Sequence, residues 1–113
     1  MASSTVPVTI AQRHKLLYNS PPPPAELVRW GDRYRDKGLL HDALEFYAAA
    51  KEERAILALC AQALETADLV LYLNARRARS LDPDHEELRR LRACAVGQGK
   101  ESVARRVDLL LLK

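Results

Sequence analysis

The chain has little cysteine, few glycines and no long apolar run, and each shortage excludes a class of protein. Two cysteines among 113 residues are too few for a small disulfide scaffold, which normally carries several at turn-like spacing. No stretch approaches the roughly 18 apolar residues of a membrane span, and the N-terminus lacks the apolar segment of a secretory signal. We therefore expect a cytoplasmic protein without a membrane segment, in which Cys60 and Cys94 are reduced and partly buried.

Strand-forming residues are also scarce. β-branched residues become sparse after Ile10, whereas the helix formers Ala, Leu and Arg dominate. Apolar residues make up 48% of the chain and charged residues 29%, a balance that supports a packed core and argues against disorder throughout. At 113 residues the chain holds one domain at most. We expect an all-α domain over residues 25–113, preceded by a tail and proline spacer over residues 1–24.

The first 24 residues show no sustained hydrophobic period. Thr5 to Ile10 alternate briefly, but Pro7 restricts this stretch to an edge strand or an extended arm. Pro21 to Pro24 favour polyproline II geometry and predict a stiff spacer, with Pro24 near the first position of a helix. The tail is expected either to be mobile or to lie in a groove of its own domain or of a neighbour.

Apolar spacing after the prolines predicts six short helices. Because the connections between them span only a few residues, consecutive helices should pair as antiparallel hairpins. Lys37 followed by Gly38 marks the end of the first helix, and Thr66 or Asp68 is the expected N-cap of the fourth. The expected helices cover about residues 25–37, 40–51, 53–64, 69–81 and 85–96, and a sixth begins at residue 100 or 101. The third is expected to bury Ile56, Leu57, Leu59, Cys60 and Leu64.

The most specific spacing lies in the first hairpin. Two small residues, Gly31 and Ala43, would let the helix backbones approach closely, while Trp30, Tyr34 and Tyr47 fill the space around the contact. The full pattern comprises Leu27, Trp30, Gly31 and Tyr34 on the first helix, Gly38 in the turn, and Ala43, Tyr47 and Ala50 on the second.

This pattern resembles the tetratricopeptide repeat family, whose 34-residue unit is a pair of helices. The chain departs from the family at three places: Tyr47 replaces the usual phenylalanine, Leu27 and Trp30 stand in exchanged order, and Ala55 occupies the family's proline position. The resemblance implies three helical hairpins arranged in a right-handed superhelix.

The later hairpins resemble the family less closely. Gly99 and Ala104 repeat the spacing of Gly38 and Ala43, which supports a third repeat. Against it, a bulky Arg92 follows Leu91 where Gly31 follows Trp30. The end of the fourth helix carries a family-like run, Ala78, Leu81 and Pro83.

The resemblance implies a function in binding other proteins. In the family, the first helix of each hairpin lines a concave face that binds a peptide or a partner helix. We therefore expect a non-catalytic protein–protein interaction adaptor or chaperone-like scaffold, with no cofactor and with a partner that the sequence does not identify. The partner-binding residues implied in this way are Val28, Asp32 and Arg35 on the first helix, and Arg89, Arg92 and Val96 on the fifth.

Residues that could support catalysis or metal binding are scattered. His14, His41 and His85 lie far apart, without cysteine or carboxylate at metal-ligand spacing, and are expected on the surface. The run from Gly97 to Ser102 superficially resembles a phosphate-binding loop but lacks its four-residue spacer, and is expected to be a turn. We expect no catalytic residue, no metal site and no enzyme activity.

Arginines near the C-terminus raise an alternative function. Residues 74–113 hold ten Lys and Arg against six Asp and Glu, and the arginines at 76, 77, 79, 89, 90, 92, 105 and 106 would form a basic stripe if they line up. Nucleic-acid binding usually adds exposed aromatic residues for stacking, and no aromatic follows Tyr72. Solvated helix faces are therefore favoured over a nucleic-acid surface.

The last helix indicates a further alternative. Leu109 to Leu112 cannot all face one core, so some of these leucines must meet the tail, a second copy of the chain or a partner. A homo-oligomeric structural module is therefore the second hypothesis. Asp108, just before the leucines, is expected to face solvent, with no partner at a spacing that suggests chemistry.

Overall fold

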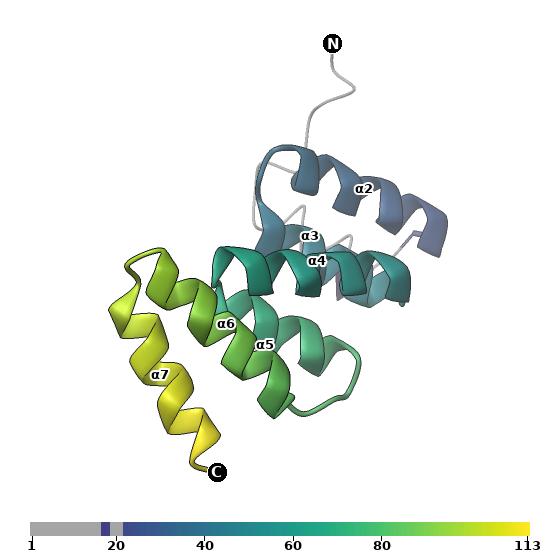
Figure 1. Cartoon of the computed structure of the whole chain (residues 1–113). Helices are drawn as coiled ribbons and strands as arrows, with labels where there is room; N and C mark the ends of the chain where they lie inside the picture. Colours follow the sequence, from purple (N-terminus) through teal and green to yellow (C-terminus); the bar gives the residue numbers. More distant parts are fainter. Residues whose placement is uncertain (1–16, 19–21) are drawn as a thin grey trace. The chain divides into compact units, whose positions relative to one another are not determined.

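The computed structural model describes residues 17, 18 and 22–113, and over these residues it is all-helical (Figure 1). The all-α prediction is confirmed, and each of the six expected helices is present. They are α2 (Pro24–Asp36), α3 (Leu40–Ala50), α4 (Glu53–Thr66), α5 (Leu69–Ala78), α6 (His85–Gly97) and α7 (Glu101–Leu111). The expected extended arm, the histidine at position 14 and most of the tail lie outside the described residues.

The helices end where the backbone turns left-handed. Each of α2 to α6 is followed by a residue with positive φ, and the next N–H bonds to a carbonyl five residues earlier at 2.8–3.0 Å. This arrangement satisfies carbonyl groups that a helix end would otherwise leave unpaired. The glycine stop predicted after α2 is therefore confirmed, and the same geometry recurs at non-glycine residues. The five left-handed residues are Gly38, Lys51, Ala67, Ser80 and Gly99.

Two predicted helix ends were wrong. α4 continues to Thr66 instead of ending near Leu64. α5 stops at Ala78, three residues before Leu81, because Ser80 takes a φ of 58° and the Leu81 N–H bonds back to the Arg76 carbonyl. Leu81 and Pro83 therefore lie in the connection to α6 and not at the end of a helix.

Helix starts follow the capping rules. Of the two candidates for the N-cap of α5, the structure selects Asp68, whose Oδ1 accepts a hydrogen bond from the Leu71 N–H at 3.1 Å. Asp84 does the same for α6 through the Glu87 N–H at 2.9 Å. Pro24 occupies the first turn of α2, as predicted.

The chain divides into two compact units, with the boundary between Ile56 and Leu57 inside α4. In the first unit, α2 and α3 pack against each other. Leu27, Tyr34 and Tyr47 are buried, as the hairpin pattern predicted. Buried residues of this unit also include Ala43, Leu44 and Phe46.

The predicted close approach of helices is present at Gly31. A Cβ atom on this residue would lie 2.7 Å from Cε1 of Tyr47, which is shorter than real contacts allow. The Tyr34 ring stacks on Phe46 with centroids 5.2 Å apart. Trp30 lies at the edge of this core, half-buried, with the Arg33 guanidinium 4.8 Å from the centre of its ring. The glycine and Tyr47 therefore make the contact, and Trp30 flanks it.

The second unit contains the rest of α4 together with α5, α6 and α7. α6 and α7 pack as a hairpin, with Gly99 at a φ of 75° in the turn between them. Gly38 has a similar φ of 79° in the turn between α2 and α3. The spacing that Gly99 and Ala104 share with Gly38 and Ala43 therefore corresponds to the same turn geometry in the first and last hairpins. The predicted burial of Leu57 was wrong, since that side chain is exposed. The largest fully buried side chains here are Leu59, Leu71, Tyr72, Leu88, Leu91 and Val107.

Leu109 and Leu112 remain exposed, at 63% and 83% of their surface. The expectation that four consecutive leucines cannot share one core is confirmed. None of the helices in the described part of the chain is long and apolar enough to cross a membrane. The right-handed superhelix stays a prediction.

Candidate protein-interaction surfaces

The six residues predicted to bind a partner fall three in each unit. In the first unit, Val28 is half-buried on α2. Asp32 accepts a hydrogen bond from the Tyr47 hydroxyl at 2.5 Å and lies 3.4 Å from the Arg35 guanidinium. These two charged side chains therefore support the α2/α3 hairpin, which sequence reasoning did not anticipate.

The other three predicted residues lie along one face of α6. Arg89, Arg92 and Val96 are spaced by three and four residues, so they follow one another on the helix surface. Val96 and Arg92 line a hollow of about 280 Å³ between α6 and α7. Val96 is 55% exposed. We call this region the α6/α7 surface; its hollow is lined by Arg92, Val96, Gly99, Glu101, Ala104, Arg105 and Asp108.

An ion pair crosses the α6/α7 surface. The Arg92 Nε donates to Asp108 Oδ1 at 2.6 Å, and the hydrogen bond from this carboxylate raises the pKa of Arg92. Asp108 is nearly half exposed, but sequence reasoning did not foresee Arg92 as its partner, because it is the helical hairpin that brings the two side chains together. Both side chains remain nearly half exposed, so the pair forms a polar wall beside Val96 instead of a buried contact.

Several of the arginines near the C-terminus bind partners within the chain. Arg76 donates to the Asp82 carbonyl at 2.8 Å and lies 3.7 Å from a Glu87 oxygen. Arg92 is paired with an acid on the next helix, and Arg105 lies 3.9 Å from Glu101. Internal acids therefore offset part of the predicted basic stripe.

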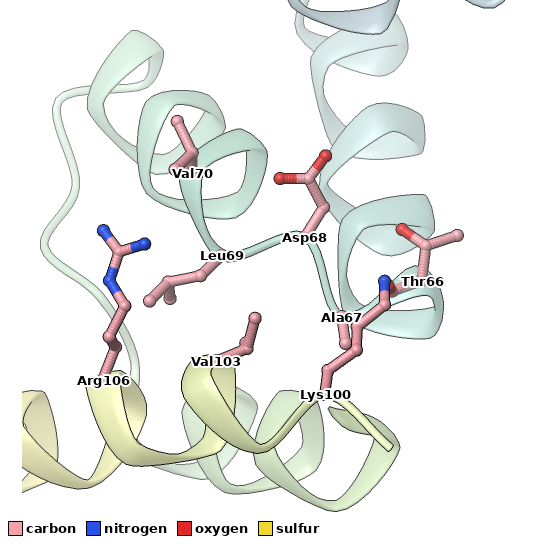
Figure 2. A pocket seen from close by; sticks show the side chains of 8 residues that line it. All are labelled: Thr66, Ala67, Asp68, Leu69, Val70, Lys100, Val103 and Arg106. Atoms are coloured by element: carbon pink, nitrogen blue, oxygen red, sulfur yellow. The ribbon is translucent and has the colours of Figure 1, made fainter. Parts of the chain in front are cut away.

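Two further hollows lie between α5 and α7. The first has a volume of about 340 Å³, and Figure 2 shows Leu69 and Val103 pointing into it, with Lys100 on one side and Arg106 on the other. Its full lining is Thr66, Ala67, Asp68, Leu69, Val70, Lys100, Val103 and Arg106.

The other hollow, of about 440 Å³, lies further along the same two helices. Leu73 and Arg77 contribute from α5, and Leu110 contributes from α7. Its full lining is Leu73, Arg77, Ser80, Leu81, Asp82, Pro83 and Leu110.

Sequence reasoning missed these hollows, although the regular spacing of the residues that line them is visible in the sequence. Leu69, Leu73 and Arg77 recur every four residues, and residues 103, 106 and 110 share one face of α7. Periodicity alone does not reveal that the two faces are neighbours.

The turn between α6 and α7 binds the end of α4. The Gln98 side chain donates to the Glu65 carbonyl at 2.7 Å, and the Lys100 amine donates to the Thr66 carbonyl at 2.6 Å. Both carbonyls belong to the last turn of α4, where a cation is also favoured by the helix dipole. The prediction of a turn instead of a phosphate-binding loop fits this structural role.

The described residues contain no group of three or more His, Cys, Asp or Glu side chains placed to hold a metal ion. Both cysteines are unpaired by disulfide. Cys60 is buried, and burial, followed by the charge of Glu87, raises the pKa of its thiol. A thiol in that environment is a weak nucleophile.

No protein family, curated protein or solved structure compared with the chain matches it.

Proposed function

We propose that this chain is a non-catalytic, tetratricopeptide-like protein-interaction module, which binds a short segment of another protein on its α6/α7 surface. One observation carries the proposal. Val96, an apolar side chain more than half exposed, lies in a hollow beside the polar wall made by Arg92 and Asp108. Such a combination offers apolar contact together with directional polar contacts, which is how helical scaffolds recognise peptides.

Arg89 extends this surface by one turn of α6. It is exposed, and among the described residues it pairs with no acid. A partner segment with an apolar side chain for Val96 and a carboxylate for Arg89 would use both groups.

The matched pair Arg89→Glu and Arg90→Glu tests the proposal. Both arginines are exposed neighbours on α6, but successive residues point about 100° apart, so only Arg89 shares the face of Val96. Partners captured by the full chain are quantified by mass spectrometry, with circular dichroism as the check on folding. We expect Arg89→Glu and Val96→Asp to deplete the same partner and Arg90→Glu to retain it. Equal capture by all variants would contradict the proposal.

The exposed leucines of α7 favour a second candidate function, self-association. Leu109 and Leu112 lie three residues apart, so they form one apolar strip on the helix. Sedimentation velocity over a range of chain concentrations measures this directly. A homo-oligomer should dissociate on dilution and be lost in Leu109→Glu with Leu112→Glu. A monomer at every concentration would exclude it.

A further inference from the structure

The helices α5 and α7 form a second elongated surface, which the proposed function does not use. The first residues of both helices line one hollow, and the later residues of both line the other. The helices therefore run in the same direction, with the hollows following one another between them. We call this surface the α5/α7 groove. Since α5 has 10 residues, the groove is roughly 15 Å long.

The floor of the groove is apolar and partly uncovered. Leu69 and Val103 both line the first hollow, between Lys100 and Arg106 (Figure 2). At the surface, Val70 is 45% exposed, and Leu81 is 39% exposed at the far end. Two hollows in a row, each with apolar side chains in its lining, are suited to the apolar face of a helix.

The rim of the groove is basic and carries cations that are not paired with acids. Arg106 makes no ion pair among the described residues. The hydrogen bond of the Arg77 guanidinium goes to the amide oxygen of Asn74 at 3.3 Å. The Lys100 amine donates to a backbone carbonyl. By contrast, the two arginines that line the hollow of the α6/α7 surface, Arg92 and Arg105, are paired with carboxylates.

Two acids also lie along the groove. The Asp68 carboxylate is bound to the Leu71 N–H as the cap of α5. Asp82 lies at the far end, beside Pro83. The excess of positive charge is therefore greatest at the end formed by Lys100 and Arg106.

We propose that the α5/α7 groove binds an acidic amphipathic helix of about three turns from another protein. Its apolar side chains, at the i, i+3 and i+7 positions, would fill the two hollows, and its carboxylates would pair with Arg106 and Arg77. This partner is distinct from the segment bound on the α6/α7 surface, so the chain would connect two proteins.

Charge argues against other occupants of the groove. The tail of the chain carries Arg13 and Lys15 and no acid in its first 24 residues, and a second copy of the chain has a net charge of +3. Both share the sign of the rim, which opposes their binding. A nucleic acid would match the charge, but the groove offers no exposed aromatic side chain for stacking.

The probe is a fluorescent peptide of about 15 residues, long enough to be partly helical alone, with leucines on one face and glutamates on the other. Anisotropy is measured with the full chain. Arg106→Glu is compared with Arg105→Glu, whose side chain points about 100° away around α7 and lines the hollow of the α6/α7 surface instead of the groove. Both variants are checked by circular dichroism. We expect Arg106→Glu to weaken binding about tenfold and Arg105→Glu to change it less than about twofold. Added salt should weaken binding by the unmodified chain.

Three control ligands complete the experiment: a scrambled peptide with dispersed leucines, a version with lysine for glutamate, and a single-stranded oligonucleotide. None of them should bind as tightly as the acidic peptide. The proposal is overturned if the acidic peptide does not bind, if the scrambled peptide binds equally well, or if Arg105→Glu and Arg106→Glu have the same effect. Tighter binding of the oligonucleotide through Arg106 would overturn it too, as would chain self-association that Arg106→Glu abolishes.

Discussion

The ring of Tyr47 on α3 lies directly against the backbone of Gly31 on α2. Tyr47 is fully buried, and its hydroxyl donates to Asp32, the residue after the glycine. Tyr47 is therefore fixed by two contacts with α2, one between its ring carbons and Gly31 and one between its hydroxyl and Asp32. In the α6/α7 hairpin the same separation of 16 residues joins Arg92 to Asp108, so an ion pair stands where the first hairpin has an aromatic contact.

We expect Gly31→Ala to destabilise the protein. The added methyl group would lie 2.7 Å from a ring carbon that cannot move away, which costs about 1–3 kcal/mol and outweighs the gain of up to about 1 kcal/mol in helix propensity. Urea unfolding measures the difference. Gly97→Ala is the matched control, because that helical glycine has open space around it. A stabilising Gly31→Ala would contradict the assigned contact.

Substitutions at two exposed turns with left-handed residues should change the stability of the protein in opposite directions. Gly99 has a φ of 75° and open space around it, so Gly99→Ala should cost about 1 kcal/mol through backbone strain alone. Ser80 already bears that strain at a φ of 58°, so Ser80→Gly should gain up to about 1 kcal/mol. Thermal unfolding of both variants checks this. Changes of the same sign would show that left-handed geometry does not govern these turns.

Alkaline pH should destabilise the fold through two buried tyrosines. Burial, helped by the carboxylates of Asp32 and Glu87 respectively, raises the pKa of Tyr47 and Tyr72 well above the ordinary value near 10. The folded chain therefore retains protons that the unfolded chain loses. The contribution of these two tyrosines to the free energy of unfolding should be constant below about pH 10 and fall above it.

Absorbance of tyrosinate during an alkaline titration, measured alongside unfolding, tests this coupling. In the double variant Tyr47→Phe with Tyr72→Phe, the fall in stability above pH 10 should be shallower. At neutral pH the same variant should lose about 1 kcal/mol per hydrogen bond. An unchanged alkaline slope would mean that these two hydroxyls ionise freely in the folded protein.

The two cysteines should react at different rates with a thiol reagent such as Ellman's reagent. Cys94 is half-buried, whereas Cys60 is 7% exposed and its thiol pKa is raised by burial. Two kinetic phases are therefore expected for the folded chain and a single fast phase in denaturant. The variant Cys94→Ser should retain only the slow phase. If Cys60 reacts as fast as a free thiol, α4 opens locally more often than the packing implies.

Local patterns were sufficient to predict most of the helical fold. Lys37 and Gly38 predicted the end of α2, and the spacing of Gly31 with Tyr34 predicted a close hairpin, because caps and periodicity depend on neighbouring residues. The errors fell where a helix end had no glycine. Ser80 takes a left-handed conformation, which cannot be predicted from a serine as it can from a glycine. For this reason α5 was predicted three residues too long.

The candidate surfaces were predicted less completely. Arg89, Arg92 and Val96 lie on one face because of helical spacing, which the sequence displays. The pairing of Arg92 with Asp108 requires α7 to fold back on α6, and neither residue indicates it.

The sequence by itself determined the number and approximate bounds of the helices, and the close approach of two helices at Gly31. That the Tyr47 ring makes this contact is seen only in the structure. Only the tertiary structure decided which charges are used internally and which remain for a partner. Asp32 and Asp108 are occupied, whereas Arg106 beside Leu69 is not. The reason is physical: helix formation depends on residues a turn apart, but an ion pair or a groove depends on which helix faces become neighbours, and that is set by packing of the whole unit.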